Sequence, residues 1–205
     1  MIYKKTFRFH DLPSTFHYWF AGARKGVKIN WLMKNYEKCI RVIEDFPKKG
    51  ISFKDICPLL MDPKAFDESI DDMAEIVRKW GGCDIVAGPE ARGFIFALPL
   101  AQKLGKGFVM ARKKGKLPGK TLAKTYDIEY GTDTIEVPEF AIKPGSKIVL
   151  VDDLLATGGT MAALIELFEA VGAKVIGVVT LIELTDLNGK EVISAPYESL
   201  IKYPH

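Results

Sequence analysis

Apolar runs and helical spacings alternate along most of the chain. Four continuous apolar runs are typical of buried strands, at 83–88, 107–111, 147–153 and 174–184. Apolar residues at helical spacing follow two of these runs, over about 93–104 and from about 159 to Gly172. This alternation predicts an α/β fold, in which an open parallel sheet is covered by helices on both faces.

Two further helices are predicted before the first of these strands. Apolar residues over 32–46 recur at steps of three and four, which predicts an amphipathic helix. A short strand-and-turn stretch, GISFKDICPLL, follows it. Asp62 and Pro63 then provide an N-cap and a first helical position, and we expect that helix to end at Gly81 and Gly82.

The composition is that of one globular domain. Of 205 residues, 48% are hydrophobic and 27% are charged, and no apolar run reaches the roughly 20 residues of a membrane-spanning helix. The three cysteines show no CxxC spacing, so we expect reduced thiols and a cytoplasmic location. The three histidines lie near the chain ends, which disfavours a histidine-based dyad or zinc site.

The first 32 residues differ from the rest of the chain. They are aromatic and carry six basic residues against one acidic residue, which leaves a net charge of −2 for the remainder of a chain whose total is +3. An acidic body does not indicate a nucleic-acid partner. Because Met33 opens the regular pattern, we hypothesise that residues 1–32 precede the true start and that 33–205 form the domain. The alternative is a genuine extension that packs on the body or on a partner.

The stretch VLVDDLLATGGTM ends an apolar strand in two acids and continues into a small turn before a helix. In open parallel sheets, ligands bind at the carboxyl ends of the strands. Backbone N–H groups at a glycine-bearing helix start form a phosphate cradle. Asp152 and Asp153 would repel a phosphate, so we expect them to accept hydrogen bonds from vicinal ribose hydroxyls. The cradle consists of Ala156, Thr157, Gly158, Gly159 and Thr160.

The order strand, acid pair, ATGGT and helix resembles the phosphoribosyl pyrophosphate (PRPP) motif of the type I phosphoribosyltransferases. The stretches EDFPKKGISFKDI, EARGF, RKKGKLPG, YDIEYGT and LIELTDLNG extend this resemblance from about Asn35 to the C-terminus. The chain is most similar to the members that act on adenine. The resemblance implies the type I fold with a small hood and a flexible lid loop. It also implies purine salvage, in which the 5-phosphoribosyl group of PRPP passes to adenine and gives AMP and pyrophosphate.

The resemblance also implies roles for charged residues. It assigns four cations to the pyrophosphate: Arg92, Arg112, Lys113 and Lys116. The last three begin the polar stretch 112–133, which we expect to be a lid that closes over PRPP and excludes water. Near its far end, the resemblance makes Glu129 the catalytic carboxylate that assists the loss of the N9 proton, and Tyr130 a cover for the site.

The stretch GISFKDI matches the base-binding stretch of the family. By this resemblance, Phe53 packs on the purine ring, and the backbone at Ser52 and Lys54 reads the 6-amino group. Many family members have arginine where Lys54 stands. The resemblance further implies Mg²⁺ bound mainly through PRPP and pyrophosphate, with no protein ligand named, although either acid of the pair could touch a coordinated water. It also implies a homodimer, to which the helix predicted over 32–46 could contribute.

Two other functions remain open on the sequence. One is a phosphoribosyltransferase for hypoxanthine, guanine, xanthine or a pyrimidine, against which GISFKDI and YDIEYGT argue. The other is a PRPP-sensing regulator without catalytic activity, whose N-terminal module would bind DNA. A leader of 32 residues without helical periodicity is short for such a module. Synthesis of PRPP is disfavoured because the sequence contains no GxxxxGK[ST] loop for ATP.

Overall fold

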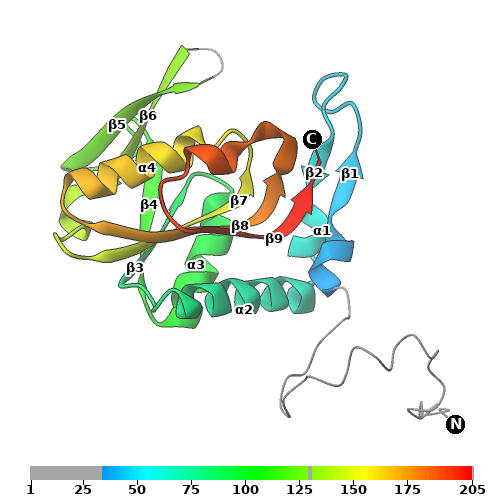
Figure 1. Cartoon of the computed structure of the whole chain (residues 1–205), viewed down its shortest axis with the longest axis horizontal. Helices are drawn as coiled ribbons and strands as arrows, with labels where there is room; N and C mark the ends of the chain where they lie inside the picture. The colour runs from blue at the N-terminus through cyan, green and yellow to red at the C-terminus, as the bar shows by residue number, and fades with distance from the viewer. Residues whose placement is uncertain (1–33, 129–130, 205) are drawn as a thin grey trace, which may run out of the picture. The chain divides into compact units, whose positions relative to one another are not determined.

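The computed structural model describes residues 34–128 and 131–204, and its centre is a seven-stranded sheet (Figure 1). The strand order is β5-β6-β4-β3-β7-β8-β9. Five strands run parallel: β3 (Ile85–Pro89), β4 (Gly107–Lys113), β7 (Lys147–Leu155), β8 (Lys174–Leu184) and β9 (Tyr197–Tyr203). At one edge, β5 (Thr121–Ile128) and β6 (Gly131–Pro138) pair in antiparallel fashion. The α/β prediction is confirmed, with this antiparallel edge as an addition.

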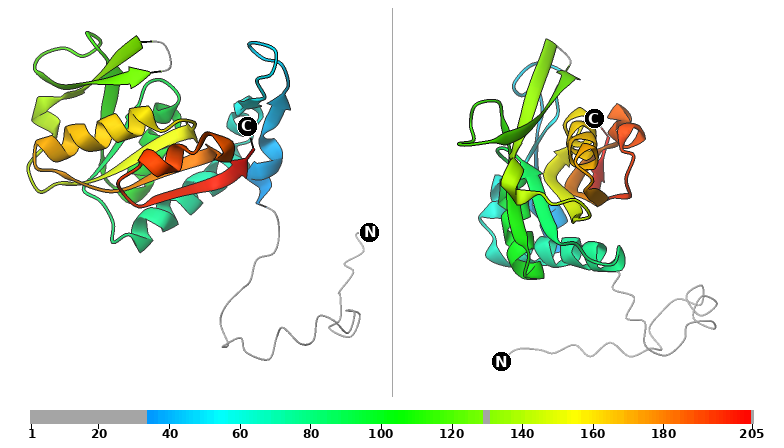
Figure 2. Two further views of the ribbon diagram at one scale, coloured as in Figure 1. Left: turned by 45° about the horizontal axis from the view of Figure 1, so that its top comes forward. Right: turned by 90° about the vertical axis from the view of Figure 1, so that its left-hand side faces the viewer.

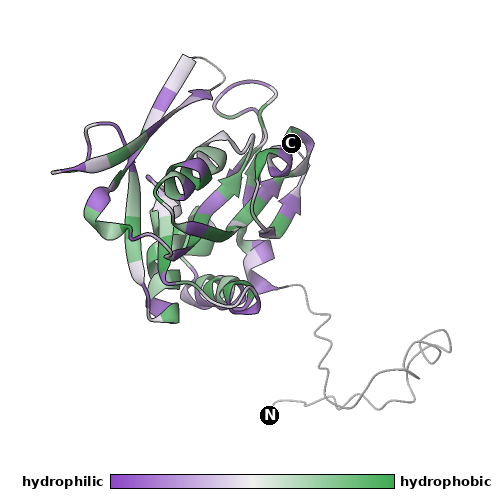
Figure 3. Ribbon diagram, turned by 60° about the vertical axis from the view of Figure 1, so that its left-hand side comes forward, coloured by the Kyte–Doolittle hydropathy of each residue, from purple (hydrophilic) through white to green (hydrophobic). Residues whose placement is uncertain are grey.

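Three helices cover the two faces of the sheet. The helices α2 (Pro63–Lys79) and α3 (Gly93–Leu104) pack on one face, and α4 (Gly159–Ala170) packs on the other (Figures 1 and 2). Apolar residues therefore concentrate in the central strands and on the helix faces turned toward them (Figure 3). The Asp62 side chain caps α2 by accepting hydrogen bonds from two backbone N–H groups, as its position before Pro63 predicts.

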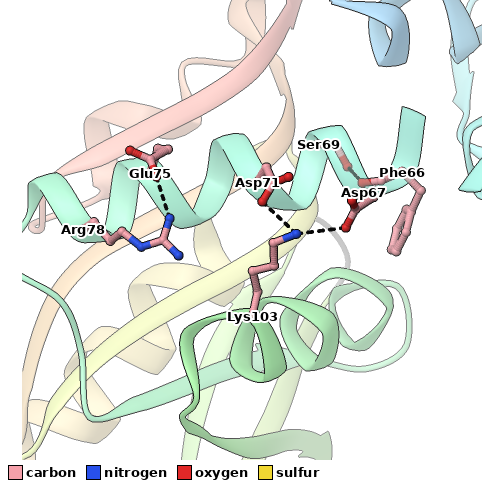
Figure 4. Close-up of polar contacts among 7 residues, drawn as sticks. All are labelled: Phe66, Asp67, Ser69, Asp71, Glu75, Arg78 and Lys103. Atoms are coloured by element: carbon pink, nitrogen blue, oxygen red, sulfur yellow. Dashed lines mark hydrogen bonds and ion pairs between the residues drawn. The ribbon is translucent and has the colours of Figure 1, made fainter. Parts of the chain in front are cut away.

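Polar contacts join α2 and α3 on their outer side. Nζ of Lys103 on α3 lies 3.0 Å from Asp67 Oδ1 and 2.8 Å from Asp71 Oδ1 on α2 (Figure 4). These two acids are four residues apart and therefore share one helix face. Exposed ion pairs of this kind contribute little to stability, so the apolar contacts between the helices carry most of the packing.

The helix predicted over 32–46 is wrong. A 3₁₀-helix η3 (Asn35–Cys39) is followed by strand β1 (Arg41–Ile43), which pairs with β2 (Phe53–Asp55) in an antiparallel hairpin. The β-branched residues of β1 favour a strand, and pairing with β2 satisfies its backbone. The buried residues Tyr36 and Ile40 fit helical spacing, but Phe46 is exposed and its ring meets Phe53 edge-on at 5.2 Å.

The stretch 112–133 is largely regular, so the expectation of a loop over its whole length is also wrong. Arg112 and Lys113 complete β4, and β5 and β6 form a long hairpin. The hairpin is ordered because Leu122 and Tyr126, on one face of β5, pack against the core beneath α4. Glu129 and Tyr130, which follow β5 and precede β6 in the sequence, lie outside the described residues.

The outcome of the sequence analysis also differs between the C-terminal strand β9 and the N-terminal residues 1–33. Strand β9 was not predicted, because charged residues interrupt its apolar pattern and only Ile201 in it is buried. Residues 1–33 lie outside the described residues, so the hypothesis of a start at Met33 stays a prediction. Among the residues described, no helix is long and apolar enough to span a membrane.

Candidate active site

The acid pair lies on β7 beside the start of α3. The Asp153 backbone N–H donates to Asp152 Oδ1 at 2.8 Å, and Arg92 Nε lies 3.0 Å from Asp153 Oδ2. The Asp153 side chain is almost fully buried, whereas that of Arg92 is 47% exposed. Asp153 Oδ2 accepts no well-aligned hydrogen bond from the described residues, despite the nearby guanidinium. A buried carboxylate oxygen is therefore left with one poorly aligned cationic neighbour.

The surroundings of the pair disfavour negative charge on both acids at once. Burial raises the pKa of Asp152 well above its ordinary value, and the adjacent charge of Asp153 raises it further. Burial also raises the pKa of Asp153, and the Arg92 guanidinium offsets part of that rise. Hydrogen-bond donors or a cation brought by a ligand would stabilise the ionised pair.

A glycine lets α3 approach the acids closely. A Cβ at Gly93 would lie 3.0 Å from Asp152 Oδ1 and 2.9 Å from Pro89 Cδ. The N-terminus of α3, with its unpaired N–H groups and partial positive charge, therefore lies against the carboxylates. Arg92 stands at the N-cap of the same helix.

The phosphate cradle is shaped by backbone packing. Gly158 caps α4 with φ of +81°, and a Cβ there would lie 2.4 Å from Gly189 O and 2.6 Å from Val192 Cγ2. A Cβ at Gly189 would in turn lie 2.1 Å from Ala156 O. The segment after β8, which contains Gly189 and Val192, therefore packs against the cradle turn and limits its shape. A cavity of about 120 Å³ opens in front of the cradle and includes Asp152 in its lining.

The packing of Gly189 against the cradle shows that the stretch LIELTDLNG supports the cradle turn. The sequence alone suggested no role for this stretch. Asn188 has φ of +52° and Gly189 follows it, so the chain turns sharply toward the cradle. The Asn-Gly pair signals a tight turn in the sequence, but nothing local signals what it touches.

The β5–β6 hairpin reaches the cradle from the other side. The Tyr126 hydroxyl lies 3.2 Å from Thr160 Oγ1, and the Asp127 carbonyl oxygen would be 3.7 Å from a Cβ at Gly159. Tyr126 was not among the predicted site residues. Its two-residue alternation with its neighbours predicts a strand face but gives no sign of this contact.

The cation Arg112 is held by an acid that the sequence did not single out. Its Nε and Nη2 donate to Glu90 Oε2 at 2.9 and 2.8 Å, and its Nη1 donates to the Lys116 carbonyl at 3.1 Å. The Lys113 backbone N–H donates to the other Glu90 oxygen at 2.7 Å. Burial alone would raise the pKa of Glu90, but these donors outweigh it and lower that pKa.

Lys113 is also paired with an acid. Its Nζ lies 3.1 Å from Asp133 Oδ2, across the β4–β6 boundary. This hydrogen bond raises the pKa of Lys113 and lowers that of Asp133. A cavity of about 210 Å³ lies here, lined by Glu90, Lys113, Tyr126 and Thr160 among others. The structure therefore brings the predicted cation Lys113 and the cradle residue Thr160 to one cavity.

The predicted base-binding residues lie on the β1–β2 hairpin, apart from this group. Lys54 Nζ donates to Ser52 Oγ at 2.7 Å, and Ser52 Oγ donates to Glu44 Oε1 at 3.1 Å. Phe53 packs against Phe46. Within the described residues, these side chains form no hydrogen bond or ion pair with the acid pair or the cradle. Any contact between base and ribose sites would run through a ligand.

Comparisons with known proteins agree on one family. The model of the phosphoribosyl transferase domain matches residues 59–203. The adenine phosphoribosyltransferase of Mycoplasmopsis pulmonis is 51% identical over 169 residues, which cover 82% of this chain and 98% of that protein.

Solved structures point the same way. The crystal structure of adenine phosphoribosyltransferase from Thermoanaerobacter pseudethanolicus is 49% identical, with a TM-score of 0.78 over 82% of this chain and 98% of that one. The Saccharomyces cerevisiae enzyme, complexed with D-2,5-dideoxy-2,5-imino-altritol 1,6-bisphosphate and adenine, is 38% identical, with a TM-score of 0.78 over 80% and 96%.

Proposed function

The chain belongs to the adenine phosphoribosyltransferases, and we propose that three neighbouring parts of its site share the work of that family's reaction. The chain transfers the 5-phosphoribosyl group of PRPP to adenine and gives AMP and pyrophosphate. One structural observation is the main support for assigning separate roles to these three parts of the site. A glycine-built cradle at the start of α4 follows closely after an acid pair near the end of the central strand β7, in which Asp153 is buried and Asp152 half-buried.

The first part binds the ribose 5-phosphate. The backbone N–H groups of 156–160 and the hydroxyls of Thr157 and Thr160 hold the 5-phosphate at the positive end of α4. The ribose hydroxyls donate to Asp152 and Asp153, which supplies the hydrogen bonds that the buried oxygen of Asp153 lacks. This arrangement fixes the anomeric carbon relative to the rest of the site.

The second part neutralises the pyrophosphate as it leaves. Arg92 lies beside the acid pair, and Arg112, Lys113 and Lys116 lie at the end of β4 and just beyond it. Three of these cations are already paired: Arg92 with Asp153, Arg112 with Glu90 and Lys113 with Asp133. The acids hold the cations in place, and the ligand competes with them for the same charge.

The site also suits Mg²⁺ that arrives with PRPP. No group of three or more metal-ligating side chains occurs among the described residues, so a protein cage is not offered there. Mg²⁺ keeps waters and prefers phosphate oxygens, and one or two carboxylates suffice to hold it. Asp152 and Asp153 are the residues that would touch its waters. When bound, the ion adds positive charge that stabilises the leaving pyrophosphate.

The third part handles the base. Glu129, between β5 and β6 in the sequence, accepts the proton that adenine loses as the bond to N9 forms, and Tyr130 covers the site. Phe53 packs on the purine ring, while the backbone of Ser52 and Lys54 distinguishes the 6-amino group from an oxygen. These roles rest on the family resemblance of YDIEYGT and GISFKDI.

We further propose a homodimer in the cytoplasm. Leu98 on α3 and Met110 on β4 are large apolar side chains that remain exposed, and an interface between copies would cover such residues. The three cysteines are free thiols, as expected in a reducing compartment. Light scattering of the purified chain tests the dimer, and a monomeric mass would contradict it.

A panel of bases tests the proposed function. The purified protein is mixed with PRPP, Mg²⁺ and one base at a time, and nucleotide and pyrophosphate are measured. We expect AMP with adenine and no nucleotide with hypoxanthine, guanine, xanthine or the pyrimidines. Product from another base would keep the phosphate site and overturn the reading of GISFKDI. PRPP binding without product from any base would favour a regulator.

A further inference from the structure

Lys54 is a buried lysine with few partners. The residue is 5% exposed, and its Nζ donates one hydrogen bond, to Ser52 Oγ. An ammonium group has three donors, and burial of a charge is costly unless other groups stabilise it. No carboxylate among the described residues forms an ion pair with this ammonium. Another group must therefore stabilise its charge.

That group is the ring of Tyr203. The Lys54 Nζ lies 5.3 Å from the ring centroid, within the range in which a cation is attracted to an aromatic face. The attraction is larger where a cation is desolvated, and Lys54 as a residue is only 5% exposed. The last strand of the chain therefore supplies a partner to the hairpin that carries the base-binding stretch.

The body of the protein holds Tyr203 firmly. Tyr203 is the last residue of β9 and pairs with Leu184 at the end of β8. The Thr185 hydroxyl donates to its carbonyl oxygen at 3.3 Å. The end of β9 lies beside β2 in Figure 1 and in the left view of Figure 2. The Tyr203 side chain also packs against the core cluster that contains the α2 and α3 residues, so the ring is held in place relative to the sheet.

The contact extends into the hairpin by hydrogen bonds. Ser52 Oγ accepts from Lys54 Nζ and donates to Glu44 Oε1, so the hydroxyl has a defined direction. Glu44 follows β1 and Ser52 precedes β2. The Lys54 ammonium therefore links the two sides of the hairpin to one another and both of them to β9.

We propose that Tyr203 is a positioning residue for the base site. Its ring fixes the Lys54 ammonium, and Lys54 and Ser52 in turn fix the backbone that reads the purine edge. Tyr203 needs no contact with adenine for this role. The inference rests on the proposed function, because it matters to catalysis only if the segment 52–54 binds the base.

The test compares Tyr203→Leu with Tyr203→Phe. Leucine removes the aromatic face, whereas phenylalanine keeps the face and removes only the hydroxyl. We expect the leucine variant to raise the KM for adenine about three- to tenfold, in line with the loss of one buried cation–π contact. Its kcat and its KM for PRPP should stay within about twofold of the unaltered chain, because the cradle is not involved. The phenylalanine variant should match the unaltered chain in all three constants.

A double-mutant cycle separates this role from general support of the fold. In a Lys54→Met background the ammonium is gone, so we expect Tyr203→Leu to change the adenine KM no further. A full effect of Tyr203→Leu in that background would overturn the proposal. So would an unchanged adenine KM in Tyr203→Leu, or equal losses in the leucine and phenylalanine variants.

Failure of the proposed function has a different signature. In that case the unaltered chain would itself form no AMP from adenine, and the inference would fall with the function. AMP formation by the unaltered chain, together with an adenine KM that Tyr203→Leu leaves unmoved, would overturn the inference alone.

Discussion

The phosphate cradle and the basic cluster of β4 face the same ligand but are built by different means. The cradle is formed by backbone, and its shape depends on the contact of Gly158 with Gly189. The basic cluster is formed by long side chains, and its shape depends on pairing with the carboxylates Glu90 and Asp133. The cradle has no room for additional atoms, whereas the basic cluster depends on the balance between its positive and negative charges.

Because of this difference, we expect the two regions to respond differently to ligand binding and to mutation. A backbone cradle is ready before the ligand arrives, and the one hydroxyl contact that it makes within the described residues, between Thr160 and Tyr126, carries no charge. The paired cations must weaken their ion pairs with the carboxylates in order to bind pyrophosphate. The free energy of pyrophosphate binding is therefore reduced by the cost of weakening those ion pairs. We therefore expect the cradle to respond to changes of volume, and the basic cluster to respond to pH.

The largest effect is expected from Gly158→Ala. The added Cβ would overlap Gly189 O and Val192 Cγ2, and the residue would keep a φ of +81° that alanine disfavours. The turn must shift, and a misplacement of about 1 Å in a catalytic site lowers rates by roughly a hundredfold. We expect a loss of that size in kcat/KM for PRPP, measured by steady-state kinetics.

Gly172→Ala is the matched control for this change. Gly172 has a φ of +77° after the far end of α4, and a Cβ there would meet Pro144 at 3.4 Å, an ordinary contact distance. This variant should lose about 1 kcal/mol of stability and keep its kcat/KM. Equal kinetic losses in the two glycine variants would show that strain at positive φ, and not the shape of the cradle, causes the effect.

The next effect is expected from Glu129→Gln, between β5 and β6 in the sequence. The amide cannot accept the proton that adenine loses, so we expect turnover to fall at least about tenfold while PRPP binding survives. Rapid-mix product assays and PRPP titrations measure the two properties. Glu139→Gln, in the turn after β6, serves as the control. Unaltered turnover in Glu129→Gln would refute the catalytic role.

A smaller effect is expected from Asp133→Asn, and it depends on pH. The Lys113 ammonium lowers the pKa of Asp133, so the pair adds stability above the ordinary aspartate value of 3.8. That contribution is lost as the pH falls below 3.8 and through the lower pKa of the folded state. Because the Lys113 side chain is 66% exposed, the pair is screened by solvent. We therefore expect the unaltered chain to melt only about one to two degrees above the variant near neutral pH, and the difference to vanish in acid.

Asp127→Asn on the neighbouring strand is the control for Asp133→Asn. Asp127 is exposed and forms no ion pair with the described residues. Its substitution should leave the melting temperature nearly constant across the same pH range, as measured by scanning calorimetry. A melting difference for Asp133→Asn that persists unchanged into acid would contradict the role of the ion pair.

The smallest effect is expected from shortening the chain to begin at Met33. If residues 1–32 precede the true start, their removal should leave the kcat for AMP formation and both KM values within about twofold. A large loss of activity would instead favour an extension that packs on the body or on a partner. Mass spectrometry of the native protein gives an independent answer, because an intact Met1 would contradict the hypothesis.

The sequence predicted those features that depend on neighbours in the chain. The helices α3 and α4 and the strand β8 begin or end within a few residues of their predicted bounds, because apolar spacing and glycines mark their ends. The acid pair and the glycine-bearing turn were also visible, since five consecutive backbone positions form the cradle.

Features that depend on distant contacts were missed. Arg112 and Glu90 are 22 residues apart, and Gly189 touches Ala156 only because β8 returns beside β7. The segment 35–43 carries a helical spacing, yet residues 41–43 form a strand because they pair with β2. A single sequence shows the cations of this site but not the acids that hold them.

Binding of ribose 5-phosphate in the absence of base and pyrophosphate tests the central claim most directly. Isothermal titration would measure its affinity for the unaltered chain and its competition with PRPP. Because the cradle and the acid pair are formed in advance, we expect ribose 5-phosphate alone to bind, to compete with PRPP and to lose affinity in Gly158→Ala but not in Gly172→Ala. PRPP that binds while ribose 5-phosphate neither binds nor competes would contradict the claim, and would place the binding energy in the pyrophosphate and its cations.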